Sequence, residues 1–205
     1  MRLASVQVGK PAQVGELRTG FGKRPVPGEV RVGCENLDGD GQADRRYHGG
    51  PDMAVLAYSA DHYPAWREEL AWPDLPAGGF GENLSVEGAT EETACIGDVW
   101  RVGTATLQIA SPRKPCRKIS DFWRRPELLK LVQGSGRFGW YLRVLEEGAL
   151  VPGRYAGGVS SLAKQVWRVP TALPPALIDP GAYAATPADV KLVLQSQQVA
   201  VNLAP

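Results

Sequence analysis

The chain has 205 residues, of which 23 are lysine or arginine and 22 are aspartate or glutamate, so its formal net charge at pH 7 is +1. This length fits one domain with its own hydrophobic core and leaves room for a small appendage. The near-neutral charge argues against a generally polycationic nucleic-acid-binding protein, although local basic patches are compatible with it. The high content of glycine (24) and proline (17) predicts many turns and short strands rather than long helices.

The three cysteines, Cys34, Cys95 and Cys116, are too few and too scattered for a disulfide framework, and none belongs to a C-x-x-C pair. The first residues lack the apolar run of a signal peptide, and no stretch of about 18 apolar residues follows them. We therefore expect a cytoplasmic protein that is not inserted in a membrane.

Short strands separated by glycine-rich turns dominate most of the chain. In chain order, the patterns predict strands at 3–8, 29–34, 53–58 and 84–86, a helix at 59–70, a hairpin at 97–109 that turns at Gly103, one or two helices at 119–133 broken at Pro126, and a strand at 140–145. His62, on the first helix, is expected to pack or to lie at the surface rather than to act in catalysis.

Residues 36–52 form a long polar segment, and loops of this length in a compact domain are usually functional or disordered. Within it, Asp38-x-Asp40-Gly41 superficially resembles the start of a calcium loop. The twelfth position of that pattern carries Gly49 instead of a bidentate glutamate, so we exclude calcium binding.

The composition changes towards the end of the chain. Residues 159–169 predict a late strand or extended segment, and from Pro170 onward prolines punctuate a mostly small and apolar segment. Residues 188–203 have apolar side chains at helical spacing and predict the one clear helix of this part. We therefore divide the chain into a main domain at 1–165 and a small helical appendage at 166–205.

The segment 111–118 carries the clearest chemical signal. Cys116 lies there beside a proline and among cationic side chains, which favour the thiolate, the form of cysteine that acts as nucleophile or metal ligand. Pro112 and Pro115 predict a stiff, irregular loop rather than a helix or a central strand. The alternative for this segment alone is a buried structural cysteine in a loop that happens to be basic.

Five motifs follow one another along the chain: His48-Gly49-Gly50-x-Asp52-x-Ala54-Val55, Gly81-Glu82-Asn83-Leu84, Gly97-Asp98, Pro112-Arg113-x-Pro115-Cys116 and Gly139-Trp140-Tyr141-Leu142-Arg143-Val144. In this order they resemble the pattern of the MOSC domain family, which is named for the C-terminal domain of molybdenum cofactor sulfurases. The closest resemblance is to the bacterial YiiM-type subgroup. Members of that subgroup often carry a three-helix C-terminal domain, whereas the tail here predicts one helix.

The resemblance implies a mainly β, barrel-like fold with flanking short helices that binds the molybdenum cofactor (molybdopterin). It implies that Cys116 is the thiolate ligand of molybdenum and that the protein reduces N-hydroxylated compounds or related N- or S-oxides. The candidate cofactor-binding residues are Lys23, Arg45, His48, Asn83, Arg113 and Arg137. The four cations lie in or beside loops suited to phosphate contacts, with a solvated surface charge as the alternative for each. His48 would donate to the phosphate or to a substrate oxygen, and Asn83 would bind the pterin or only shape its turn. Glu82 is expected to brace its loop.

Such a reductase needs an external flavin or iron–sulfur electron donor, because three scattered cysteines cannot hold a cluster and no G-x-G-x-x-G fingerprint is present. Two alternatives stay open. One is a carrier of the molybdenum cofactor or of sulfur without reductase activity. The other, ranked last, is a polyanion-binding module built from Arg113, Lys114, Arg117, Lys118, Arg124 and Arg125 around Trp123. The sequence does not decide between a monomer and a dimer.

Overall fold

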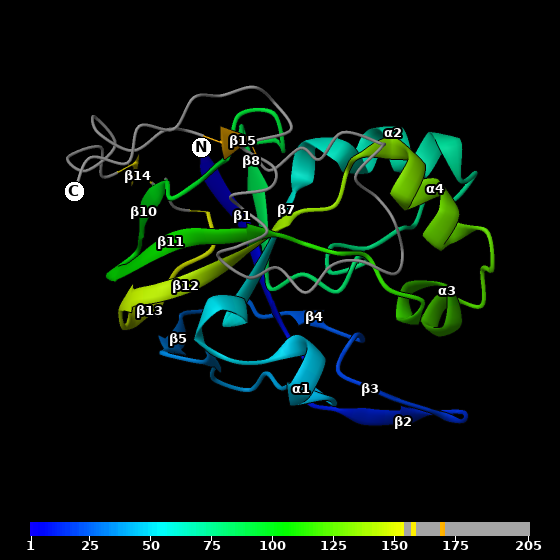
Figure 1. The fold of residues 1–205 in the computed structure, drawn as a ribbon, viewed down its shortest axis with the longest axis horizontal. Helices are drawn as coiled ribbons and strands as arrows, with labels where there is room; N and C mark the ends of the chain where they lie inside the picture. The colour runs from blue at the N-terminus through cyan, green and yellow to red at the C-terminus, as the bar shows by residue number, and fades with distance from the viewer. Residues whose placement is uncertain (154–156, 159–168, 171–205) are drawn as a thin grey trace, which may run out of the picture.

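The protein is mainly β, with one large curled sheet and a few short helices, as a computed structural model describes it for residues 1–153, 157–158 and 169–170 (Figure 1). The strands of the large sheet are β1 (Arg2–Val8), β4 (Arg24–Pro25), β7 (Val55–Ser59), β8 (Leu84–Glu87), β10 (Val99–Val102), β11 (Ala105–Pro112), β12 (Trp140–Glu146) and β14 (Gly157–Gly158). Their spatial order is β14-β10-β11-β12-β7-β8-β1-β4. The β7–β8 pair is parallel, and the other neighbours are antiparallel.

Three smaller sheets complete the β structure. Their strands are β13 (Gly148–Leu150), β5 (Val30–Gly33) and β6 (Asn36–Leu37), then β15 (Val169–Pro170) with β9 (Cys95–Ile96), and the hairpin of β2 (Ala12–Val14) with β3 (Leu17–Thr19). The hairpin predicted at 97–109 is confirmed: Val102 pairs with Ala105 around a turn in which Gly103 has φ +63°. A Cβ on Gly103 would come within 2.0 Å of the Ala149 carbonyl oxygen, so only glycine fits this turn.

The helices gather mainly at one end of the sheet, where α2 (Tyr63–Glu69), α3 (Lys118–Trp123) and α4 (Leu128–Ser135) lie near one another (Figure 1). The predicted break at Pro126 separates α3 from α4, because proline cannot continue a helix. The helix predicted at 59–70 begins as the 3₁₀ turn η2 (Ala60–His62) before α2. In the part of the chain that the structure describes, no helix is long and apolar enough to cross a membrane.

Two hydrophobic clusters hold these elements together. The first is built mainly from strand residues such as Leu3, Leu107 and Trp140, all fully buried. The second lies under the helices, where the Tyr58 and Phe80 rings stack with their centroids 4.5 Å apart. Most of the strand residues belong to the first cluster and α2–α4 to the second, with β7 contributing to both, so the loops that connect strands to helices lie at the boundary between the two.

The expected mainly β, barrel-like fold with flanking short helices is confirmed, and the sheet is a curled half-barrel with β14 and β4 at its edges. The polar segment 36–52 is more regular than predicted. It contains β6, the short helix α1 (Arg45–His48) and the 3₁₀ turn η1 (Pro51–Met53), and the Asp44 carboxylate caps α1 by accepting from the Arg46 N–H. The helix predicted at 188–203 and almost all of the segment 159–169 lie outside the described residues, as does nearly all of the predicted appendage.

Candidate functional site

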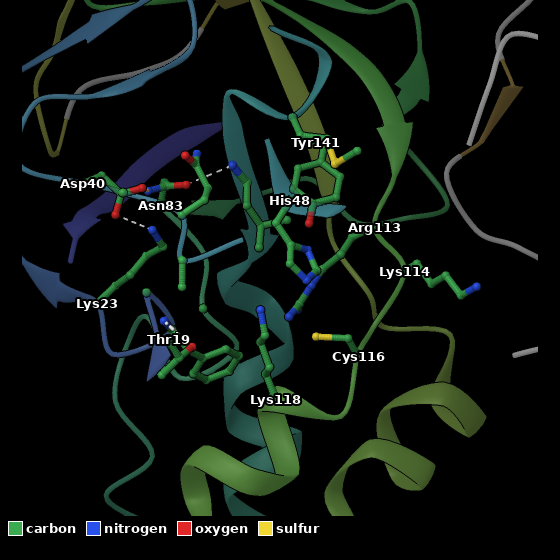
Figure 2. A pocket seen from close by; sticks show the side chains of 18 residues that line it. Thr19, Lys23, Asp40, His48, Asn83, Arg113, Lys114, Cys116, Lys118 and Tyr141 are labelled. Carbon is green, nitrogen blue, oxygen red and sulfur yellow. Dashed lines mark hydrogen bonds and ion pairs between the residues drawn. The ribbon is translucent and has the colours of Figure 1, made fainter. Parts of the chain in front are cut away.

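A pocket opens at the boundary between the sheet and the helices, close to α3 (Figure 2). It is lined by Thr19, Gly20, Phe21, Lys23, Asp40, Gly41, Gln42, Ala43, His48, Met53, Leu56, Gly81, Asn83, Arg113, Lys114, Cys116, Lys118 and Tyr141. The space between its atoms measures about 630 Å³, part of which is open to solvent. A concave site into which several polar side chains converge is the usual form of a small-molecule or cofactor site.

Cys116 lies on the loop that joins β11 to α3, and its Sγ points into the pocket (Figure 2). Ser111 and Pro112 still belong to β11, where Pro112 pairs with Trp140, so the irregular loop begins only after Pro112. Cys116 is partly exposed, Cys95 is buried and Cys34 is exposed away from the pocket lining. The buried structural cysteine considered from the sequence therefore does not describe Cys116.

Arg113 is a buried charge in the pocket wall. The residue is only 4% exposed, and its backbone N–H donates to the Gly139 carbonyl oxygen at 3.0 Å. Its Nη1 is buried without a hydrogen-bond partner, and its guanidinium forms no ion pair with any residue that the structure describes. An unpaired buried cation is unfavourable unless an anion completes it.

His48, the last residue of α1, lies near Arg113 and Lys118 at the same pocket (Figure 2). Burial lowers the pKa of the His48 imidazole below its usual 6.5, and the charges of Lys118 and Arg113 lower it further. His48 is therefore neutral at pH 7, with one ring nitrogen as donor and the other as acceptor.

Lys23 and Asp40 form a buried ion pair on the opposite wall, with side chains 8% and 1% exposed. The same carboxylate accepts from the Gly9 N–H and from the Asn83 Nδ2, each at 2.9 Å. Burial lowers the pKa of Lys23, against the opposing effect of Asp40. Lys23 therefore reaches the pocket with its charge already matched.

The side-chain amide of Asn83 forms hydrogen bonds with other residues of the protein. Besides Asp40, its Nδ2 donates to the Gln7 carbonyl oxygen at 3.3 Å, and its Oδ1 accepts from the Leu56 N–H at 3.1 Å. Of the two roles considered from the sequence, this geometry supports the shaping of the pocket wall.

Tyr141, on β12, contributes its ring and hydroxyl to the pocket. Burial raises the pKa of this phenol, with Arg113 opposing the rise and Cys116 adding to it. The Tyr141 hydroxyl is therefore protonated at pH 7 and can act as a hydrogen-bond or proton donor.

Two predicted cofactor-binding residues do not line the pocket. Arg45 lies on the outer surface, where it pairs with Glu35. Arg137 covers the Trp66 ring, with its Cζ 3.8 Å from the ring centroid, and pairs with Glu69 at 2.6 Å. The geometry gives both arginines structural partners away from the pocket.

The bracing role predicted for Glu82 is confirmed. Its fully buried carboxylate accepts from the Tyr63 hydroxyl at 2.6 Å and from the Gly78 N–H at 2.8 Å. His62 has the expected packing role, with its Nε2 2.6 Å from the Glu91 carboxylate.

Comparison with known families decides what kind of protein this is. The model of the MOSC domain matches residues 44–155. The chain belongs to the MOSC domain family. Among the residues discussed above, His48, Asn83, Arg113, Cys116 and Tyr141 lie within the matched part, and Lys23 and Asp40 precede it.

Relatives of this MOSC protein come from bacteria and fungi. It is 47% identical to YflK of Bacillus subtilis over 153 residues (73% of this chain and 69% of YflK). It is 35% identical to YiiM of Escherichia coli over 144 residues (68% of this chain) and 35% identical to a reductase of Gibberella moniliformis over 156 residues (75% of this chain). The match spans 60% of YiiM and 28% of the reductase.

Solved structures support the same family and subgroup. YiiM from Geobacillus stearothermophilus superposes with a TM-score of 0.65 at 36% identity, covering 77% of this chain and 74% of that one. YiiM from Escherichia coli gives a TM-score of 0.68 at 26% identity, covering 98% and 96%. The predicted membership of the YiiM-type branch is thereby confirmed.

Sequence reasoning missed Asp40 and Tyr141 as pocket residues of the MOSC protein. Tyr141 could have been found, because strand alternation places Trp140 and Leu142 in the core and Tyr141 on the other face. Asp40 was considered only as a calcium ligand. Its role depends on Lys23, whose proximity no spacing rule indicates.

Proposed function

We propose that this MOSC protein binds the molybdenum cofactor in the pocket and reduces N-hydroxylated compounds or related N- or S-oxides. The electrons would come from an external flavin or iron–sulfur protein. The observation that carries this proposal is the pairing of a buried, uncompensated Arg113 with an accessible Cys116 in one small pocket. The names of the relatives, YiiM and a reductase, agree with it.

The donor set fits this cofactor, which carries a phosphate and a metal that accepts a protein thiolate. Arg113 offers the unsatisfied Nη1 to an anionic group, and Lys118 adds a second cation beside it. Cys116 would supply the thiolate. When bound, the cofactor would supply the two-electron chemistry that removes oxygen from the substrate.

Tyr141 and His48 would take part in the proton transfers and hydrogen bonds that the reduction requires. Reduction of an N–OH group to N–H releases water and consumes two electrons and two protons. Tyr141 is protonated at its hydroxyl, and the neutral His48 has one N–H that can donate a hydrogen bond. Both side chains line the pocket with Cys116, so Tyr141 is the candidate proton donor and His48 the candidate hydrogen-bond donor to a substrate oxygen.

The test is the molybdenum and pterin content of protein from a host that makes the cofactor. We expect both in the parent protein, loss of molybdenum in Cys116→Ala, and no loss in the control Cys34→Ala, whose thiol is exposed outside the pocket lining. Reduction of an N-hydroxylated purine base with a reduced viologen should follow the molybdenum content. Absence of metal and pterin after reconstitution with free cofactor would refute the proposal.

A carrier of the cofactor or of sulfur is the second candidate, because the partly exposed Cys116 thiol could also hold a persulfide. The two candidates differ in turnover. A cofactor-loaded protein that reduces no N-hydroxylated substrate, yet gains a persulfide on Cys116 from a cysteine desulfurase, would establish the carrier.

A further inference from the structure

We propose that the exposed cations on the loop and helices beside Cys116 form a docking surface for an acidic electron-donor protein. This surface, here called the basic surface, consists of Lys114, Arg117, Arg124 and Lys130. The inference rests on the proposed reductase function, and it assigns a place to the external donor that this function requires.

Positive charge is concentrated in this part of the chain. Residues 113–130 contain seven lysines or arginines and two acidic residues, Asp121 and Glu127. The rest of the chain contains sixteen cationic and twenty acidic residues. A protein with a net charge of +1 thus carries a local excess of five positive charges on a background of four negative ones.

The four cations are exposed. Lys114 is exposed and lies at the rim of the pocket, whereas Arg113, one residue earlier, is buried in its wall (Figure 2). The Arg117 side chain is 84% exposed, and Arg124 and Lys130 are also exposed. The basic surface therefore begins at the rim of the pocket with Lys114 and continues outside the lining with the other three residues.

A rigid base supports the basic surface. The Trp123 Nε1 donates to the Gly79 carbonyl oxygen at 2.7 Å, and its ring packs edge-on against Trp72 with centroids 4.7 Å apart. Ile119 and Leu128 anchor α3 and α4 in the second core cluster. Leu131, 44% exposed next to Lys130, adds an apolar contact. Charges around a small apolar contact on fixed elements are suited to a transient protein partner.

The same observations argue against a single-stranded nucleic acid as the occupant. Binding of single strands uses aromatic side chains on which bases stack. Trp123, which lies among these cations, packs nearly perpendicular to the rings of Trp72 and Phe122, with centroids 4.7 and 4.8 Å away. The Trp123 ring packs against the second core cluster. The basic surface therefore offers positive charge, but Trp123 does not offer a ring on which bases could stack.

Docking at this place has a direct chemical use. Each N–O bond that is reduced requires two electrons, which the donor's reduced flavin or cluster gives up as it is oxidised. A donor seated on the basic surface would lie beside the loop that holds Cys116, the proposed metal ligand. Opposite charges on the two proteins would also raise the rate of encounter by about 10- to 1000-fold at low salt.

The experiment compares two reductants of the cofactor-loaded protein: a net-negative bacterial flavodoxin with its reductase, and a reduced viologen, which needs no docking. The test variant is Arg117→Glu/Lys130→Glu. The control is Arg101→Glu, another exposed arginine with a carboxylate partner, on β10 at the opposite end of the sheet from α3 (Figure 1). None of the three substituted residues, Arg101, Arg117 and Lys130, lines the pocket.

We expect the test variant to lose about tenfold or more in kcat/KM for flavodoxin and to lose most of its salt dependence. The control should change neither value, and viologen-driven turnover should be the same in all three proteins. An unchanged kcat/KM for flavodoxin in the test variant would overturn the docking surface while leaving the reductase function standing.

Direct binding keeps the inference testable even if no reductase activity is found. Flavodoxin binding to the parent at low salt that weakens about tenfold in the test variant would support the surface. If flavodoxin does not bind, and a labelled single-stranded oligonucleotide binds the parent but not the variant, the surface recognises nucleic acid and the proposal is wrong.

Discussion

Arg113 is tied to Gly139 by a single backbone hydrogen bond of 3.0 Å, from the arginine N–H to the glycine carbonyl oxygen. The Gly139 N–H in turn donates to the Glu91 carboxylate at 2.7 Å. The loop that carries Cys116 is therefore fixed to the start of β12 through one glycine, which makes this glycine sensitive to substitution.

We expect Gly139→Ala to destabilise the protein by about 2–4 kcal/mol. Gly139 has φ +78°, and an added Cβ would come within 2.3 Å of the Ala57 carbonyl oxygen. Gly134, near the end of α4, is the matched control: its Cβ would meet nothing within 4 Å, and its φ is not positive. Gly134→Ala should therefore stabilise by about 0.5–1 kcal/mol. Urea unfolding measures both values, and equal effects would contradict this account.

Arg113→Met should make the cofactor-free protein more stable, by about 1–3 kcal/mol, and unable to hold the cofactor. The substitution removes a buried charge that has no counter-ion among the described residues and keeps most of the side-chain volume. Urea unfolding of cofactor-free protein and the molybdenum content of loaded protein check the two halves. A less stable variant that still binds the cofactor would show that Arg113 is structural.

Asp40→Asn should destabilise the protein by about 3–5 kcal/mol, because it leaves the buried Lys23 ammonium without its partner. The pKa of Lys23 is already lowered by burial, so the unfolded state holds this proton at higher pH than the folded state. Stability should therefore rise as the pH increases from the lowered pKa of Lys23 towards 10.5. The double variant Lys23→Met/Asp40→Asn should recover part of the loss and show a flatter pH dependence. Urea unfolding of the parent, the single variant and the double variant between pH 7 and pH 10 measures these effects. Parallel plots of unfolding free energy against pH for the three proteins would refute the prediction.

His48 should titrate below its usual 6.5 in a proton NMR experiment, which is simple here because the chain has 2 histidines. Lys118→Met should raise the pKa of His48, because it removes a positive charge that disfavours the imidazolium. The stability that His48 contributes is fully present above pH 6.5 and is lost as the pH falls through its lowered pKa. Lys130→Met is a control, since that exposed lysine does not line the pocket. An identical titration in the parent and Lys118→Met would contradict the proximity on which this depends.

The sequence predicted the elements that depend on local rules. The turn at Gly103 and the break at Pro126 follow from backbone restrictions that are visible in any single sequence. The family resemblance implied a metal-ligand role for Cys116 and cofactor contacts for Lys23, His48, Asn83 and Arg113, and the structure places all five residues in the lining of one pocket.

What the sequence could not predict is the direction of each side chain. Arg113 and Lys114 are neighbours of the same charge, but the first is buried in the pocket wall and the second is exposed. Arg137 stands in a loop as rich in glycine as the one that holds Lys23, yet Trp66 and Glu69 hold it elsewhere. Such differences depend on partners that are distant in the sequence.

The pocket wall extends from Thr19 to Tyr141 along the chain, with Lys23 and Asp40 contributed early and Cys116 late. Contacts between such distant segments form only after most of the chain has collapsed around them. An incompletely folded chain could thus display the thiol but not the opposite wall. A ligand that contacts both the Cys116 loop and the Lys23–Asp40 wall would bind only fully folded molecules and, by mass action, stabilise the folded state.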